Sequence, residues 1–233
     1  MLLMRQRESE AVELMDALDC DPQKLEQTYR QFGLVNWLFS GWRKLYVEEL
    51  RPLLSPGTIT TVLDIGSGGG DLARLLAQWS QKDKLILEIT GTDPDARAYG
   101  FAARRPHHPS VSFLQADSSG LVRDGRRFDV VISNHVIHHL PPADLTRLLT
   151  DSQTLARQLC LHNDLRRSMA AYGLFWLAAL PFRGSFIRAD GLVSIRRSYT
   201  PAELTAATPP GWCVQRHAPF HQVLVHRPVQ SDV

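Results

Sequence analysis

The chain has 233 residues, of which 44% are hydrophobic and 21% are charged, and its formal net charge is +2. This length suits one enzyme-sized domain, and the composition favours a packed core over a disordered chain. The near balance of charge gives no reason to expect a nucleic-acid partner. Three widely spaced cysteines form no CxxC pair, which argues against disulfides and zinc and favours a cytoplasmic protein. No stretch reaches the roughly 18 apolar residues that a membrane-spanning helix needs.

The first part of the chain is expected to be helical. Apolar residues recur at three- and four-residue spacing over residues 9–54. Asp21 and Pro22 make an N-cap and first-turn pair for a helix that starts near residue 22. The sequence therefore predicts an N-terminal helical layer over residues 1–57, in the same domain as residues 58–233.

Strand-like and helix-like segments alternate from residue 59 onward. Strands are predicted at residues 59–65, 84–92, 111–115, 128–133 and 158–162, and helices at residues 71–81, 96–104 and 142–155. Such alternation predicts βαβ crossovers and a parallel sheet with helices on both faces. Residues 212–220 and 222–227 resemble two closing strands. We therefore expect an α/β fold, Rossmann-like and doubly wound, with a mostly parallel seven-stranded sheet.

A different pattern follows the fifth predicted strand. Residues 170–182 (AAYGLFWLAALPF) predict an apolar helix, residues 188–204 an irregular connection, and Thr200 with Pro201 a helix start. The sequence thus predicts a helical insertion near residues 166–190. We favour a substrate lid over a buried core helix for this apolar stretch. Arginines flank it, and they suit an aromatic acceptor with an acidic group or peripheral contact with a membrane surface; they are Arg166, Arg167, Arg183 and Arg188.

A glycine-rich turn follows the first predicted strand, in VLDIGSGGGD (62–71). Glycines let a ligand approach the backbone closely, and the N-terminus of the following helix offers free N–H groups. A nucleotide-like ligand is therefore expected. The dinucleotide fingerprint G-x-G-x-x-G would place its third glycine at Asp71, so a nicotinamide dinucleotide is disfavoured.

Polar residues end four successive strands: Asp64, Asp93, Asp117 and Asn134. Ligands of open parallel sheets bind at the carboxyl ends of the strands. A carboxylate after the second strand can accept two ribose hydroxyls, and an acid after the third can accept from an adenine amine. Together they outline an adenosine that carries a charged tail. The alternative for Asp117 is the N-cap of a helix.

These motifs together resemble the class I S-adenosylmethionine-dependent methyltransferases, in the branch of the ubiquinone and menaquinone pathway enzymes. Four segments carry the resemblance: VLDIGSGGGDLA (62–73), GTDPDARA (91–98), FLQADSSGL (113–121) and FDVVISNHVIHHL (128–140). The resemblance covers residues 59–165 and implies S-adenosylmethionine as the methyl donor.

The resemblance also implies a role for each matching residue. Gly66, Ser67 and Gly68 would pass under the methionine part of the cofactor, and Asp64 would organise its amino end. Further residues would bind the ribose (Asp93), the adenine (Pro94, Asp117 and Ser118) or face the sulfonium and the acceptor (Asn134 and His135).

Three histidines follow the fourth strand as H-x-x-H-H: His135, His138 and His139. A neutral imidazole can take a phenolic proton, so His135 and His139 are the candidate catalytic bases. A structural role in the loop is the alternative for His139. Ubiquinone-pathway O-methyltransferases carry a metal-binding Glu-x-x-Glu-His pattern here. Histidine replaces both glutamates in this chain, so no metal is expected.

The sequence thus predicts methyl transfer from S-adenosylmethionine to a small, lipophilic acceptor that is aromatic or quinone-like. Such a reaction suits quinone biosynthesis or secondary metabolism, with O-methylation favoured over C-methylation. Two alternatives are a non-catalytic partner subunit that binds S-adenosylmethionine and a nicotinamide-dependent oxidoreductase. The oligomeric state is left open.

Overall fold

The computed structural model describes residues 4–217 and 219–228, so the parts of the predicted ranges that fall on residues 1–3, 218 and 229–233 lie outside it. Its seven-stranded sheet has the order β3-β2-β1-β4-β5-β7-β6, in which β7 runs antiparallel to β5 and β6 and the other four pairs are parallel. The predicted sheet is confirmed. The strands are β1 (Ile59–Ile65), β2 (Ile86–Thr92), β3 (Val111–Leu114), β4 (Phe128–Asn134), β5 (Ala156–Leu165), β6 (Cys213–His217) and β7 (His221–His226).

Helices cover both faces of the sheet because its central strands are apolar on both sides. Leu63 and Val131 of β1 and β4 pack toward α5 (Ser118–Arg123) and α6 (Pro142–Leu155). On the opposite face, buried side chains come from α3 (Asp71–Lys82) and from residues 42–54, which begin with α2 (Trp42–Leu45). The remaining helical elements up to β5 are α1 (Pro22–Phe39), η2 (Tyr46–Leu50), η3 (Arg51–Leu53), α4 (Ala96–Arg104) and η4 (Ile137–His139).

The helix predicted to start near residue 22 is confirmed, but the helical prediction for residues 9–21 is wrong. The carboxylate of Asp21 accepts hydrogen bonds from the N–H groups of Gln23 and Lys24, as an N-cap does. Among residues 4–20, the only helical turn is η1 (Leu14–Asp16). The periodic apolar residues Leu14 and Leu18 of this segment are exposed, whereas Met15 and Cys20 pack against the cluster that contains Tyr29 and Phe101. We call residues 4–20 the N-terminal strap.

The first helices after β5 are α7 (Met169–Ala178) and α8 (Ile187–Arg197). The irregular connection predicted for residues 188–204 is therefore wrong over α8. Gly191 and some of the polar residues around it have low helix propensity, so the sequence pattern does not indicate a helix here. Packing of Gly191 against Phe175 of α7 stabilises the helix instead. The predicted helix start at Thr200 is confirmed, because Thr200 and Glu203 form the capping box of α9 (Pro201–Ala207).

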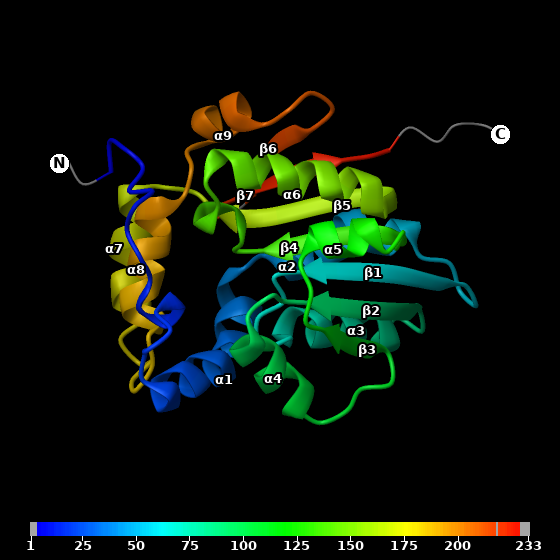
Figure 1. Cartoon of the computed structure of the whole chain (residues 1–233), viewed down its shortest axis with the longest axis horizontal. Coiled ribbons are helices and arrows are strands. Elements are labelled where there is room, and N and C mark those ends of the chain that lie inside the picture. Colours follow the sequence, from blue (N-terminus) through cyan, green and yellow to red (C-terminus); the bar gives the residue numbers. More distant parts are fainter. Residues whose placement is uncertain (1–3, 218, 229–233) are drawn as a thin grey trace.

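The strands β1, β2 and β4 point with their carboxyl ends toward α7, α8 and the N-terminal strap (Figure 1). These three segments stand at one end of the sheet, with the blue strap running along α8. No helix in the described part of the chain is both long and apolar enough to cross a membrane.

Candidate active site

A cavity of about 450 Å³ lies at the carboxyl ends of the parallel strands. Its wall is built from these strand ends and from α1, α7, α8 and the N-terminal strap. The cavity brings together most of the residues that the sequence predicts for the site: Asp64, Gly66, Ser67, Gly68, Asp93, Pro94, Asn134, His135 and His139. Asp117 and Ser118 are not part of this wall.

The glycine turn after β1 needs glycine for two different reasons. At Gly66 the backbone φ is +68°, and an added Cβ would lie 2.6 Å from a methyl group of Val136. At Gly68 φ is +53°, and an added Cβ would meet nothing within 4 Å. Gly66 is therefore required by packing and backbone, whereas Gly68 borders open space. Its N–H donates a hydrogen bond to Asp93 at 2.9 Å, which ties the turn to the end of β2.

Asp64 places a buried carboxylate at the bottom of the cavity. The residue is 1% exposed, and its Oδ2 has no hydrogen-bond partner within the described ranges. Burial and the nearby carboxylates of Asp71 and Asp93 raise the pKa of Asp64 well above its usual value. A cationic group would relieve both the missing hydrogen bond and the repulsion.

Asp93 is oriented by two backbone N–H groups. Its Oδ2 accepts from Gly68 and its Oδ1 from Asp95, each at 2.9 Å. Burial raises the pKa of Asp93. A carboxylate oxygen has more than one lone pair, so both oxygens keep the capacity to accept from a diol.

The side-chain amide of Asn134 is already engaged. Its Oδ1 accepts from Nε1 of Trp42 and from Nδ2 of Asn163, both at 2.9 Å, and its Nδ2 donates to Asn36 at 3.0 Å. Asn36 also donates to Asp71 at the start of α3. This network fixes α1 against the strand ends. Asn36 and Trp42 are far from β4 in sequence, and no motif marked them.

The structure uses Asp117 as the N-cap of α5. The exposed side chain accepts from the N–H of Gly120 at 2.7 Å, and Ser118 donates to Asp151 at 2.6 Å. Contact of Asp117 and Ser118 with adenine stays a prediction.

His135 forms a pair with a histidine that sequence reasoning did not select. Its backbone φ is +58°, and its Nε2 lies 3.1 Å from Nε2 of His221 on β7. Burial lowers the pKa of His135 to about 4 and that of His221 to about 3. Both rings are therefore neutral near pH 7, and one donates to the other.

His138 is buried between two carboxylates. Its Nδ1 lies 2.6 Å from Asp164, and its Nε2 lies 3.4 Å from Glu13 of the N-terminal strap. Burial opposes a charge on the ring, but the two carboxylates outweigh it and raise the pKa of His138 to about 9. The imidazolium in turn holds the pKa of Glu13 at about 2 despite burial. His138 is thus a cation near pH 7 and cannot serve as a base there.

His139 lies beside the same strap and borders the cavity. Its Nε2 is 3.7 Å from Glu13, and its Nδ1 is 3.4 Å from Asp16. Ligand atoms of Glu13, His138 and His139 lie within 4.8 Å of one another, a spacing at which three groups can share a metal ion. Attraction between the Glu13 carboxylate and the two imidazole rings accounts for the same spacing without a metal. The expected lack of a metal therefore stays a prediction.

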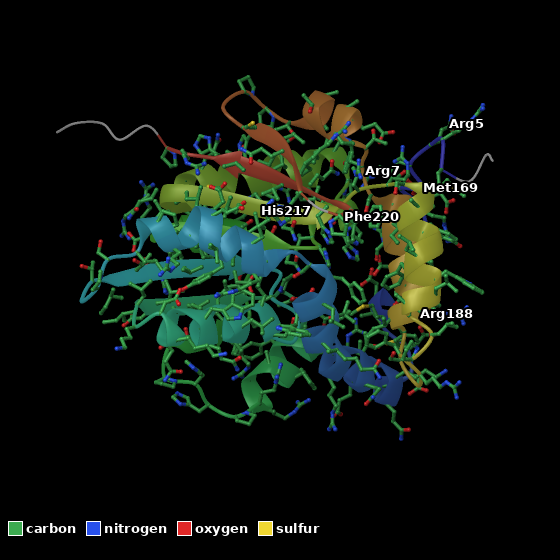
Figure 2. All side chains as sticks on the ribbon, turned by 180° about the vertical axis from the view of Figure 1, so that it is seen from behind. Arg5, Arg7, Met169, Arg188, His217 and Phe220 are labelled. Atoms are coloured by element: carbon green, nitrogen blue, oxygen red, sulfur yellow. The ribbon has the colours of Figure 1, made fainter. Side chains whose placement is uncertain are left out.

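Helices α7 and α8 supply the apolar end of the cavity. Phe175 borders the cavity and packs against Gly191, where an added Cβ would lie 2.3 Å from the ring. Trp176 is instead 45% exposed, with the guanidinium of Arg188 stacked 4.9 Å above it. Figure 2 shows Met169 and Arg188 along the outer edge of this helical pair.

The arginines that flank α7 do not line the cavity. Arg167 is buried and donates to the carbonyl of Ser198 at 2.7 Å and to Glu203 at 2.5 Å. Arg166 and Arg183 are likewise not part of the wall. Pairing between these arginines and an acidic acceptor is therefore not supported. The exposed apolar face of α7 leaves membrane contact as a prediction.

Comparison with known proteins agrees with this architecture. Residues 62–158 match a methyltransferase domain family. A ubiquinone biosynthesis O-methyltransferase of Rhizobium johnstonii is 30% identical over 122 residues, which are 51% of this chain and 46% of the relative. The chain therefore spans about half the length of this relative.

Two solved structures share the fold. Human N-acetylserotonin methyltransferase, in complex with S-adenosylmethionine, has a TM-score of 0.58 at 16% identity and covers 87% of this chain and 55% of its own. A plantazolicin methyltransferase in complex with a pentazolic desmethylPZN analogue and S-adenosylhomocysteine has a TM-score of 0.60 at 12% identity, and the match covers 92% of this chain and 96% of that chain. Residues 62–158 thus match a methyltransferase domain, and the chain shares the fold of these two methyltransferases, which were crystallised with S-adenosylmethionine or S-adenosylhomocysteine.

Proposed function

We propose that the protein transfers the methyl group of S-adenosylmethionine to a small, lipophilic acceptor that is aromatic or quinone-like, with oxygen as the methylated atom. The charge of the cavity carries this proposal. Seven carboxylates border it, and no Lys or Arg does so in the part of the chain that the structure describes: Glu13, Asp16, Asp64, Asp71, Asp93, Asp95 and Asp190. Such a wall suits a cofactor with a sulfonium and an ammonium group, and it opposes the pyrophosphate of a nicotinamide dinucleotide.

The residues at the strand ends fit this cofactor. The unpartnered oxygen of Asp64 suits the ammonium group, and Asp93 suits the ribose hydroxyls. Gly68 leaves open space beside the turn. S-adenosylmethionine, when bound, supplies an electrophilic methyl group on its sulfonium.

The acceptor would enter the apolar end of the cavity, beside Phe175 and His139. Much of the rate enhancement would come from holding an acceptor oxygen in line with the methyl group and excluding water. An unionised hydroxyl also needs a base. His139 is our candidate, because it borders the cavity and two carboxylates face its ring. His135 is the second candidate. Its low pKa makes it a weaker base.

A cytoplasmic location is also part of the proposal. Its support is that Cys20, Cys160 and Cys213 are free thiols.

The test is a methyl-transfer screen with isotope-labelled S-adenosylmethionine against phenols, catechols and quinols. Mass spectrometry of the product separates O- from C-methylation. We expect label in at least one phenolic product. Binding of S-adenosylhomocysteine without any transfer would favour the non-catalytic partner subunit. A thermal shift with NAD but none with S-adenosylhomocysteine would favour the oxidoreductase and contradict the proposal.

A further inference from the structure

The N-terminal strap places a carboxylate at the end of the cavity that Phe175 and His139 border and where the acceptor would bind. We call this the acceptor end. Glu13 is 3% exposed and borders the cavity. Its Oε1 accepts from the hydroxyl of Ser194 at 2.7 Å and lies 3.4 Å from Nε2 of His138. Its Oε2 makes no hydrogen bond within residues 4–217 and 219–228. One oxygen of an ionised carboxylate is thus left for a ligand.

Helix α8 holds the strap in place by two residues one turn apart. The backbone N–H groups of Leu14 and Met15 donate to the carboxylate of Asp190 at 2.8 and 3.0 Å. Ser194 donates to Glu13 itself. Helix α8 therefore holds both the side chain of Glu13 and the backbone of the two residues that follow it.

The charges at this end of the cavity do not cancel. Glu13 and Asp164 face the single imidazolium of His138. The guanidinium of Arg7 also attracts Asp164 but does not border the cavity. Asp16 lies 3.4 Å from Nδ1 of His139 and is paired at 3.9 Å with Arg197, which is not part of the wall.

Asp190 receives only backbone N–H groups and adds a second negative charge. Burial raises the pKa of Asp190 to about 6, so this carboxylate is ionised at pH 7.5. An acceptor at this end of the cavity therefore meets the carboxylates of Glu13 and Asp190, and no Lys or Arg of the described residues borders the cavity.

We propose that Glu13 makes this cavity selective for aromatic acceptors that are neutral or cationic and offer a hydrogen-bond donor, and that it excludes acceptors with a carboxylate. This inference rests on the proposed methyl transfer, since it assigns the same cavity to the acceptor. A hydroxyl or ammonium group can donate to the free oxygen of Glu13. An acceptor carboxylate would bring two like charges together in a site with little solvent to screen them.

The experiment is calorimetric titration of three catechols into EDTA-dialysed protein saturated with S-adenosylhomocysteine at pH 7.5. The probes share one ring and differ at one substituent: 4-methylcatechol is neutral, 3,4-dihydroxybenzylamine is cationic and 3,4-dihydroxybenzoate is anionic. We expect the first two to bind at least about tenfold more tightly than the benzoate. Glu13→Gln should reduce this ratio to about threefold or less, mainly through tighter binding of the benzoate.

Two further variants keep the test decisive. Glu8→Gln removes a carboxylate of the same strap that pairs with Arg196 outside the cavity, and it should leave the ratio unchanged. Asp190→Asn removes the second negative charge and should narrow the ratio even if Glu13→Gln fails to fold. Equal or tighter binding of the benzoate, binding of none of the probes, or an unchanged ratio in a folded Glu13→Gln would overturn the inference. Because binding needs no methyl transfer, a correct binding order without turnover would contradict only the proposed function.

Discussion

Nε2 of His138 lies 3.4 Å from the carboxylate of Glu13, while its Nδ1 lies 2.6 Å from Asp164. One residue comes from the N-terminal strap and the other from β5, so the ring joins two segments that are far apart in sequence. Both carboxylates are buried with the ring. Removal of the cation would leave them unpaired in the interior. The site and the stability of the fold are therefore linked at this histidine.

The pH dependence of stability follows from this linkage. The pKa of His138 is raised in the folded state from 6.5 to about 9. Its contribution to the free energy of unfolding is fully present below pH 6.5 and is lost as the pH rises through about 9. The loss should be on the order of 3 kcal/mol. Urea unfolding at pH 6.5 and pH 9.5 measures it, and His138→Gln should be unstable at pH 6.5 and lose this slope.

Acid should also destabilise the protein, for the opposite reason. Burial lowers the pKa of His135, His162 and His221 from 6.5 to between about 3 and about 4. Stability that depends on neutral rings is present above pH 6.5 and is lost as the pH falls through those lowered values. Maximal stability is therefore expected near pH 6.5–7. A maximum above pH 8 would contradict the charge assigned to His138.

Asp93→Ala should weaken the binding of S-adenosylhomocysteine. Loss of two charge-assisted hydrogen bonds costs about 2–4 kcal/mol, or roughly thirty- to nearly a thousandfold in Kd. Calorimetry measures this change. Glu88→Ala is the control, because Glu88 lies on β2, the strand that ends just before Asp93, and does not border the cavity. An unchanged Kd for Asp93→Ala would mean that the ribose lies elsewhere.

Asp117→Ala separates the two roles considered for this residue. As an N-cap of α5, its loss should cost about 1 kcal/mol of stability. As an adenine ligand, its loss should also weaken S-adenosylhomocysteine binding, by roughly tenfold. We predict both effects, since the cap uses only Oδ1. A lower melting temperature with unaltered Kd would restrict Asp117 to the cap.

Phe175→Ala should raise the acceptor KM by roughly tenfold and spare cofactor binding. A large apolar contact is worth about 1.5–3 kcal/mol when the acceptor is apolar. Trp176→Ala is the matched control, because the neighbouring indole is exposed beneath Arg188 and outside the cavity wall. Sequence alone predicts the same loss for both variants. Equal acceptor kinetics for Phe175→Ala and the wild type would refute the lid.

The outer face of α7 should bind vesicles that contain anionic lipid. Leu174, Trp176 and Leu177 are each about half exposed there, and Arg188 lies beside them. Leu177→Glu should reduce co-sedimentation severalfold. Ile86→Glu, a similarly exposed site on β2, should not. Equal binding to vesicles of neutral lipid, or no effect of Leu177→Glu, would argue against this surface.

The sheet and the clustering of most predicted site residues at its carboxyl edge could be predicted because their signals are local. Strand β1 and helices α4 and α6 have the bounds that the apolar pattern predicts. The glycine turn and the acids at the strand ends follow directly from the order of strands along the chain. Asp64 and Asp93 therefore border the cavity together, as expected.

The acceptor end could not be predicted in the same way, because its signals are tertiary. No motif in the sequence marks Glu13 as a site residue. Only the folded structure shows its contacts with Ser194 and His138. His221 has no motif, and only the antiparallel return of β7 brings it to His135. Helix α8 contains a glycine that weakens a helical pattern but admits the ring of Phe175.

The two halves of the cavity differ in when they can form as the chain folds. The proposed cofactor half is built on β1, β2 and β4, which all lie within residues 59–134. The acceptor half needs the contact of Leu14 and Met15 with Asp190, which closes a loop over most of the chain. Contacts between residues so far apart in sequence form late in folding. During synthesis, the strap cannot dock before α8 has been made. A refolding experiment should therefore show cofactor binding before the acceptor end becomes closed to water.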